Sequence, residues 1–152
     1  MANISNKHHS NDPSDLNRFI KAQEKVYDRV VTELKNGSKR SHWMWYIFPQ
    51  LDGLAHSTTS KYYAIKSKEE AIAYLNHPVL GTRLIECTEA VLAVEGKTVS
   101  QIFGYPDDLK LKSSMTLFSE VTTDPIFNHV LDKYFQDERD EKTLQLLNKL
   151  KK

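Results

Sequence analysis

Both tryptophans of this chain lie in one short segment that also carries an imidazole and an amide. The segment runs from His42 through Trp43, Trp45 and Tyr46 to Gln50. An indole face can stack a flat ring, while a neighbouring imidazole or amide hydrogen-bonds the edge of that ring. If the segment is extended, alternation places both indoles on one side. The same side chains equally suit an aromatic plug in the core, and burial alone does not decide between the two interpretations.

A second segment combines lysines with hydroxyl groups at a predicted helix start. It runs from Asp107 to Ser114 and contains Lys110, Lys112 and Ser113. Ammonium groups, hydroxyls and free helix N–H groups all bind anions, so the segment suggests a phosphate site. The glycines of a nucleotide-binding loop are absent, and a solvated charged turn is the better interpretation of this segment taken alone.

A third segment places a histidine at a predicted helix start and an arginine about one turn further on. His77 precedes Pro78, and Arg83 follows in the same run. A helix N-terminus lowers the pKa of a nearby imidazole, which makes His77 a candidate general base, as His42 is in the first segment. A structural histidine is the alternative, and we favour it for His77.

The remaining patterns argue against metal, nucleophile or cofactor chemistry. The histidines lack the paired spacing of a metal site, so we predict no metal. Cys87 is the only cysteine and falls on an apolar helical repeat with no base beside it, which indicates a buried structural residue. Glycine-rich dinucleotide fingerprints, serine-nucleophile motifs and paired carboxylates are all absent, and the pattern indicates no cofactor.

Charge and composition narrow the classes of partner. The chain of 152 residues has 21 basic and 20 acidic side chains, a net charge of +1 that disfavours nucleic acid and the membrane surface as partners. No apolar run approaches the ~20 residues needed to span a bilayer, and residues 1–13 lack the apolar core of a signal peptide. We therefore predict a cytoplasmic protein with a disordered N-terminal tail over residues 1–13 and one domain over residues 14–150.

Helical spacing and capping patterns predict the elements that carry these segments. The apolar repeat from Asp15 to Leu34 predicts a helix that is broken once near Gln23 and ended by Gly37. Later helix starts are marked by Ser67 with Glu70, Pro78, Thr98 with Gln101, Asp107 or Asp108, and Asp124 with Pro125. Only residues 43–48 and 62–65 are strand-like. The prediction is an all-α, compact single-domain bundle of about seven short to medium helices, with at most one small hairpin.

Three long strings of the chain resemble the family of domains of unknown function numbered 1810. They are residues 41–51, 77–84 and 107–118, and the resemblance extends over Asp15 to Leu147, including Gln23 and Tyr27. It implies a mainly helical, stand-alone cytoplasmic protein of a kind found in bacteria and fungi. Some members carry the label calpastatin, although nothing in this chain resembles a protease-inhibitor repeat. The resemblance implies no activity, but it implies that the three candidate segments are signature positions of the family.

A shared polar site is the hypothesis that unites the three segments, because a pure core would not need polar residues at its signature positions. The leading hypothesis is a cleft for a phosphate-bearing, flat-ringed small molecule, such as a nucleotide or an ADP-ribose-like compound. Its ligand-binding candidates are Trp43, Trp45, Gln50, Arg83, Lys110, Lys112 and Ser113, with His42 and His77 as the catalytic candidates. The alternative is a non-catalytic protein-interaction module that uses exposed aromatic side chains. The sequence leaves open whether the protein is an enzyme and which protein it would bind.

Overall fold

The computed structural model describes residues 15–150, and within this range the chain forms ten helices. They are α2 (Asn17–Glu24), α3 (Tyr27–Lys35), α4 (Met44–Ile47), α5 (Thr58–Tyr63), α6 (Lys68–Asn76), α7 (Leu80–Ala93), α8 (Val99–Phe103), α9 (Asp107–Ser119), α10 (Ile126–Phe135) and α11 (Glu141–Leu150). The predicted all-α class is confirmed, while about seven helices was too low a number. The predicted tail over residues 1–13 lies outside the described residues.

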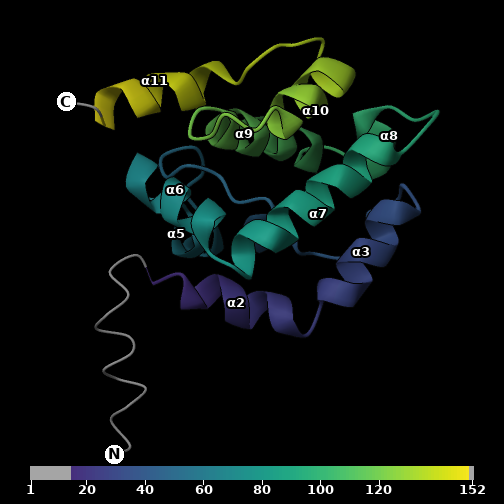
Figure 1. Cartoon of the computed structure of the whole chain (residues 1–152), viewed down its shortest axis with the longest axis horizontal. Helices are drawn as coiled ribbons and strands as arrows, with labels where there is room; N and C mark the ends of the chain where they lie inside the picture. Colours follow the sequence, from purple (N-terminus) through teal and green to yellow (C-terminus); the bar gives the residue numbers. More distant parts are fainter. Residues whose placement is uncertain (1–14, 151–152) are drawn as a thin grey trace, which may run out of the picture.

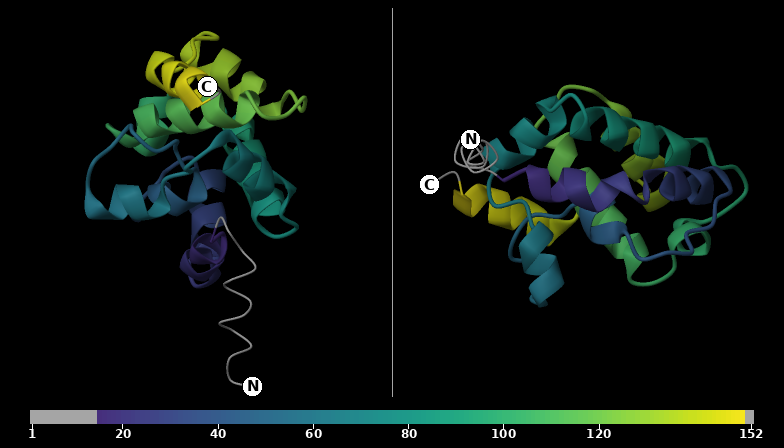
Figure 2. Two further views of the ribbon diagram at one scale, coloured as in Figure 1. Left: turned by 90° about the vertical axis from the view of Figure 1, so that its left-hand side faces the viewer. Right: turned by 90° about the horizontal axis from the view of Figure 1, so that it is seen from below.

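Helix α7 runs through the middle of the molecule, between α3 and α10 (Figure 1). It packs against α3, α6 and α10. Helix α9 in turn packs against α10, α11 and α8. Figure 2 shows α9–α11 as one layer stacked over the N-terminal helices, with α2 at the opposite end from α11. The three candidate segments therefore belong to different parts of the fold: α4, the start of α7 and the start of α9.

The helix ends agree with several of the capping patterns. The first helical repeat breaks at Lys25 and Val26, close to the predicted position, and Gly37 follows α3 with a φ of +65°. Thr98 and Gln101 form the predicted reciprocal capping box at the start of α8. Ser67 accepts the N–H of Glu70 at 3.0 Å as predicted, but the Glu70 carboxylate does not return to Ser67.

The N-terminus of α9 is built differently from the prediction. Its first residue is Asp107, and Pro106 stands at the position before it, so neither aspartate caps the helix. The Asp108 carboxylate accepts hydrogen bonds from the Ser100 hydroxyl and from the N–H of Leu109, both at 2.8 Å. At α10 the predicted helix start is off by one residue. Asp124 accepts the N–H of Ile126 at 3.0 Å as a capping residue would, but Pro125 stands directly before the helix and not at its first position.

The two strand-like stretches do not form strands within residues 15–150, which agrees with the expectation of at most one small hairpin. Residues 44–47 form one turn of helix, and residues 58–63 form α5 behind the N-cap Ser57. Helices α4 and α5 pack against each other, and just beyond them Leu51 and Ile65 form an isolated parallel bridge. Aromatic and β-branched residues favour a strand, but here tertiary packing of a buried turn overrides that preference. No helix within residues 15–150 is long and apolar enough to cross a membrane.

The core face of α7 is formed by Leu80, Leu84, Cys87 and Val91, each at most 1% exposed. Burial raises the pKa of the Cys87 thiol to about 12, in line with the predicted structural role of this residue. Near its start α7 passes very close to the end of α6. A Cβ added at Gly81 would lie 2.0 Å from the carbonyl oxygen of Leu75, so this crossing requires glycine.

Candidate functional site

Trp43 lies in the core rather than on a ligand-binding surface. Its side chain is buried, and its indole N–H donates to the Glu33 carboxylate at 2.9 Å. The same carboxylate accepts the N–H of Arg40 at 2.8 Å and the hydroxyl of Ser41 at 2.6 Å. Burial by itself would raise the pKa of Glu33, but these hydrogen bonds outweigh it and lower the pKa to about 2. Trp43 therefore has no free face with which to stack a ligand.

Trp45 is half-buried, and it meets the lysine segment as the shared-site hypothesis expects. The Lys110 ammonium lies 3.9 Å from the centre of the Trp45 ring. Asp107 pairs with Lys110 at 3.2 Å and with Lys39 at 2.8 Å, so this carboxylate neutralises part of the local positive charge. The contact joins the first and third segments. Lys110 therefore already has partners within the protein, namely the Trp45 ring in a cation–π contact and the Asp107 carboxylate.

The other candidates of these two segments have structural partners. Lys112 pairs with Glu138 at 3.1 Å, and the buried Ser113 hydroxyl donates to the carbonyl of Leu109 at 3.2 Å. Gln50 lines a crevice beside Trp45 of about 10 Å³, which is the space of about one water molecule. No room for a nucleotide exists at this crevice.

His77 caps the first turn of the helix that it precedes. Its Nδ1 accepts the N–H of Val79 at 3.1 Å and the N–H of Leu80 at 3.3 Å. This nitrogen therefore satisfies two backbone N–H groups at the start of α7. The structural interpretation of His77 fits this geometry. His42, the other catalytic candidate, is exposed, and its imidazole has no hydrogen-bond partner among residues 15–150.

Arg83 differs from the other predicted cations because no carboxylate of the described residues pairs with it. Its guanidinium donates to the Gln23 side-chain carbonyl at 3.3 Å and lies 4.9 Å from the centre of the Tyr27 ring. Gln23 is 1% exposed and donates in turn to the Tyr46 carbonyl at 2.7 Å and the Tyr74 hydroxyl at 3.1 Å. Arg83 is thus joined to the tryptophan segment through one buried amide.

The structure brings some of the predicted residues together and leaves others apart. Trp45 belongs to α4, Trp43 stands directly before it, and Lys110 contacts the Trp45 ring. Gln50 lines the same crevice as Trp45. Arg83 is linked to this turn through Gln23. His77 instead lines a groove of about 520 Å³ between the α6–α7 junction and Asp124. None of the four grooves found on residues 15–150 is lined by all three segments.

A connected run of aromatic rings was missed by the sequence reasoning. Tyr46 and Tyr63 have ring centres 5.3 Å apart, and those of Tyr63 and Tyr62 are 4.8 Å apart. Tyr62 is 55% exposed, and Tyr63 lines the crevice beside Trp45. We call Trp45, Tyr46, Tyr62 and Tyr63 the aromatic surface. The signal was the pair Tyr62–Tyr63, which we interpreted as part of a strand.

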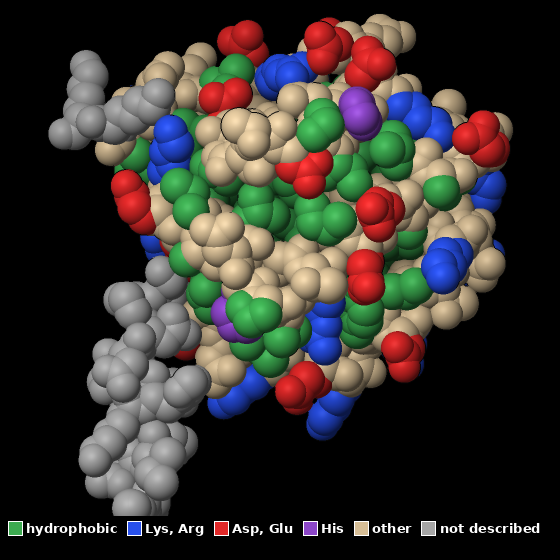
Figure 3. Space-filling model, viewed as in Figure 1, with side chains coloured by type: hydrophobic (Ala, Val, Ile, Leu, Met, Phe, Trp, Pro, Cys, Tyr) green, Lys and Arg blue, Asp and Glu red, His purple; other side chains and the backbone are tan. Residues whose placement is uncertain are grey.

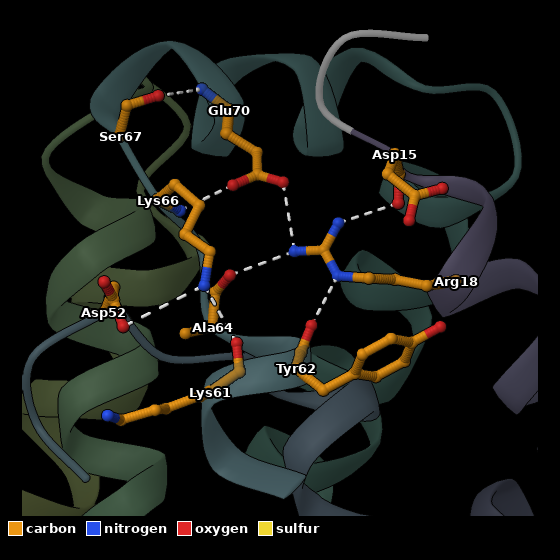
Figure 4. Close-up of polar contacts among 9 residues, drawn as sticks. All are labelled: Asp15, Arg18, Asp52, Lys61, Tyr62, Ala64, Lys66, Ser67 and Glu70. Carbon is orange, nitrogen blue, oxygen red and sulfur yellow. Dashed lines mark hydrogen bonds and ion pairs between the residues drawn. The ribbon is translucent and has the colours of Figure 1, made fainter. Parts of the chain in front are cut away.

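Arg18 fixes the end of α5 and with it the aromatic surface (Figure 4). Its guanidinium donates to the carbonyls of Tyr62 at 2.7 Å and Ala64 at 2.9 Å, and it pairs with Glu70 at 3.1 Å. Arg18 and Glu70 are both buried. Because carbonyls and a carboxylate already occupy these donors, the Arg18 guanidinium is committed to the protein itself rather than to a ligand in the groove of about 450 Å³ beside it. Arg18 acts as a positioning residue.

The largest of the four grooves lies between α3 and α7 and was not predicted. Its volume is about 730 Å³. It is lined by Tyr27, Asp28, Val31, Thr32 and Lys35 of α3, by Glu86, Glu89, Ala90 and Ala93 of α7, and by Val94, which directly follows α7. At one end the Tyr27 hydroxyl donates to Glu86. Burial first, and this hydrogen bond second, raise the pKa of Tyr27 above its usual range, so the phenol remains a donor at neutral pH.

These observations define a small helical domain with an aromatic surface, a half-buried arginine (Arg83) that pairs with no carboxylate of residues 15–150, and a large groove between α3 and α7. The chain belongs to the DUF1810 family, described as proteins of unknown function, whose model matches residues 13–147. The family expected from the three strings is thereby confirmed. The crystal structure of Rv1873, a conserved hypothetical protein from Mycobacterium tuberculosis, is similar to this fold with a TM-score of 0.89. The two proteins are 52% identical over 90% of this chain and 99% of that one. No curated protein matches the chain.

Proposed function

We propose that this protein is a non-catalytic interaction module whose aromatic surface anchors a protein partner. The observation that carries the proposal is the run of contacting rings from Tyr46 through Tyr63 to Tyr62, which ends in a tyrosine that is 55% exposed. Tyrosine and tryptophan are enriched among the side chains that dominate interface energies. They offer a large apolar area with few rotatable bonds, so ordering them on binding costs little entropy.

The scaffold beneath these rings supports the proposal. The hydrogen bond from Arg18 to the Tyr62 carbonyl fixes the end of α5, and the contact of Lys110 with Trp45 fixes the indole. A surface that is ordered before binding loses less conformational entropy when the partner arrives. The small-molecule hypothesis has less support at this place, because Trp43 is buried and Lys110 and Lys112 are paired with carboxylates.

Site-specific photo-cross-linking in the source cells tests the proposal. Benzoylphenylalanine replaces Tyr62 in one variant and Tyr105, an 80% exposed tyrosine outside the aromatic surface, in the control. We expect a discrete adduct with one protein at position 62 and none at position 105. The purified adduct partner should bind the wild-type chain and lose about tenfold or more in affinity for Tyr62→Ala. Equal adducts at both positions, or unchanged affinity of the variant, would overturn the proposal.

A second candidate function is binding of a phosphate-bearing, flat-ringed molecule, such as a nucleotide or an ADP-ribose-like compound. Arg83 favours it, because this half-buried guanidinium lies on the Tyr27 ring with no carboxylate partner within residues 15–150. A guanidinium in this state can hold a phosphate group. Calorimetric titration with ADP-ribose should show binding that Arg83→Met weakens about tenfold or more. Absence of binding to the wild-type protein would remove this candidate.

We further propose a cytoplasmic location for the protein. The support is the lack of a membrane-spanning helix in residues 15–150 together with the near-zero net charge, which offers no general attraction to an anionic membrane. Fractionation of the source cells should recover the chain with the cytoplasmic proteins, and recovery with the membrane pellet would contradict this location.

A further inference from the structure

We propose that the groove between α3 and α7 binds a short amphipathic helix of a protein partner, with lysine or arginine side chains facing this groove. The proposal goes beyond the aromatic surface, because it concerns other residues and can fail independently. Three properties of the groove carry it: its length, its apolar floor and the sign of its charge.

The length follows from the way α3 and α7 lie side by side. At one end of the groove the Tyr27 hydroxyl contacts Glu86, and beyond the other end the Lys97 ammonium donates to the Gly37 carbonyl at 2.9 Å. The two helices therefore run parallel. The groove extends along α3 from Tyr27 to Lys35, which is about 12 Å of helix. A segment of about two helical turns matches this length.

The floor of the groove is apolar and its side chains are small. Val31 lines it from α3, Ala90 and Ala93 line it from α7, and Val94 lines it just after the end of α7. Alanines leave room for a partner backbone to come close, as in other interfaces where a helix lies in a groove. Apolar side chains spaced three or four residues apart on the partner would meet this floor.

The charge of the groove selects a basic partner. Three carboxylates line it, from Asp28, Glu86 and Glu89, against the single ammonium of Lys35. Neither Asp28 nor Glu89 has a side-chain hydrogen bond or ion pair within residues 15–150. The chain as a whole carries +1, so the negative sign is a local property of this groove. Complementary charge speeds association and rejects partners of the wrong sign.

The charge is also unevenly placed along the groove. Glu86 lies at the Tyr27 end, and Asp28 follows Tyr27 directly, whereas Lys35 ends α3 at the other extreme. The partner helix should therefore place its basic residues over the Tyr27 end. On the face seen in Figure 3, acidic side chains lie among apolar ones near the centre, and basic side chains lie around them.

The test uses two designed peptides of about 15 residues with the same leucine stripe. One carries lysines on both flanks of the stripe, and the other carries glutamates at the same positions. Amide NMR spectra of the labelled full chain are recorded during titration with each peptide. We expect the lysine peptide to shift signals of α3 and α7, and the glutamate peptide to leave them unchanged.

Variants of the groove sharpen the result. The double variant Glu86→Gln with Glu89→Gln should weaken the lysine peptide about threefold to tenfold. Ala93→Arg adds bulk and a like charge, and it should abolish binding, while the exposed-loop control Thr123→Arg should not. Circular dichroism confirms the fold of each variant. Equal binding of both peptides, binding that maps to the aromatic surface, or full affinity of Ala93→Arg would each overturn the proposal.

Discussion

Glu33 offers a prediction that ties the tryptophan segment to the stability of the fold. The residue is 8% exposed, and its carboxylate accepts hydrogen bonds from Arg40, Ser41 and the Trp43 indole. Replacing it by glutamine keeps the shape but removes the charge and one acceptor oxygen. An amide N–H₂ group then faces donors, which leaves donor groups without an acceptor.

The magnitude follows from the pKa of this carboxyl. A lowering from 4.5 to about 2 corresponds at full strength to about 3 kcal/mol. Two of its donors, the exposed Arg40 and the half-buried Ser41, lie near the surface, so solvent screens part of this interaction energy. We therefore expect the carboxylate to contribute about 1–2 kcal/mol to stability. The pKa is lowered on folding, so the stabilisation is fully present above about pH 4.5. It is lost as the pH falls from there towards about 2.

Urea denaturation followed by tryptophan fluorescence measures this effect for the wild-type chain and Glu33→Gln. At neutral pH the variant should be less stable by about 1–2 kcal/mol. The difference between the two free energies of unfolding should then shrink steadily as the pH drops below about 4.5. Other carboxylates titrate in both proteins and cancel in the difference. A difference that stays constant down to about pH 3, or that is absent at neutral pH, would refute the reasoning.

Three further predictions concern the core. Gly81→Ala should destabilise the chain by about 2 kcal/mol or more in thermal unfolding, because its Cβ would lie 2.0 Å from the Leu75 carbonyl oxygen. Arg18→Met should cost about 3–5 kcal/mol in chemical denaturation by leaving the buried Glu70 carboxylate unpaired, and adding Glu70→Gln should recover part of that loss. The Cys87 thiol should react with a disulfide reagent only as fast as the protein unfolds, because it is buried and its pKa is raised to about 12.

Each of these predictions has a control or a contradicting result. Thr82→Ala, next to Gly81 on the exposed side of α7, should change the melting temperature far less than Gly81→Ala. A loss for Arg18→Met that Glu70→Gln leaves unchanged would show that the unpaired carboxylate is not its cause. Rapid labelling of Cys87 under native conditions would contradict its burial.

Local signals in the sequence predicted the helix ends well. The side chains of Thr98 and Gln101 satisfy orphan N–H groups of their own helix, so the pattern does not depend on distant contacts. Gly37 likewise reports a local backbone requirement. The turn Met44–Ile47 was misassigned because its helical state depends on distant residues: Glu33 binds the Trp43 indole and Gln23 binds the Tyr46 carbonyl.

The candidate site was predictable only in part, for the same reason. The spacing of Asp107 and Lys110 is that of an ion pair within a helix, but the sequence reasoning did not use this local signal and kept Lys110 as a phosphate ligand. Nothing local distinguishes Trp43, which is buried, from Trp45, which is half-buried. The two residues are about half a helical turn apart, so they face different surroundings only once the segment is known to be helical. The groove between α3 and α7 depends on how these two helices lie beside each other, and the sequence of neither helix alone determines that arrangement.

The most direct test of the aromatic surface as an interface is a comparison of two fluorine signals. Fluorotyrosine is incorporated at Tyr62 in one sample and at the exposed Tyr105 in another, and the ¹⁹F line width is measured in purified protein and in living source cells. A bound partner slows tumbling and alters the environment of the ring that it covers. The proposal predicts that the Tyr62 signal shifts or broadens in cells well beyond the Tyr105 signal, and that it recovers its purified line width in Arg18→Met, where α5 is no longer held. Equal behaviour of the two tyrosines in cells would contradict it.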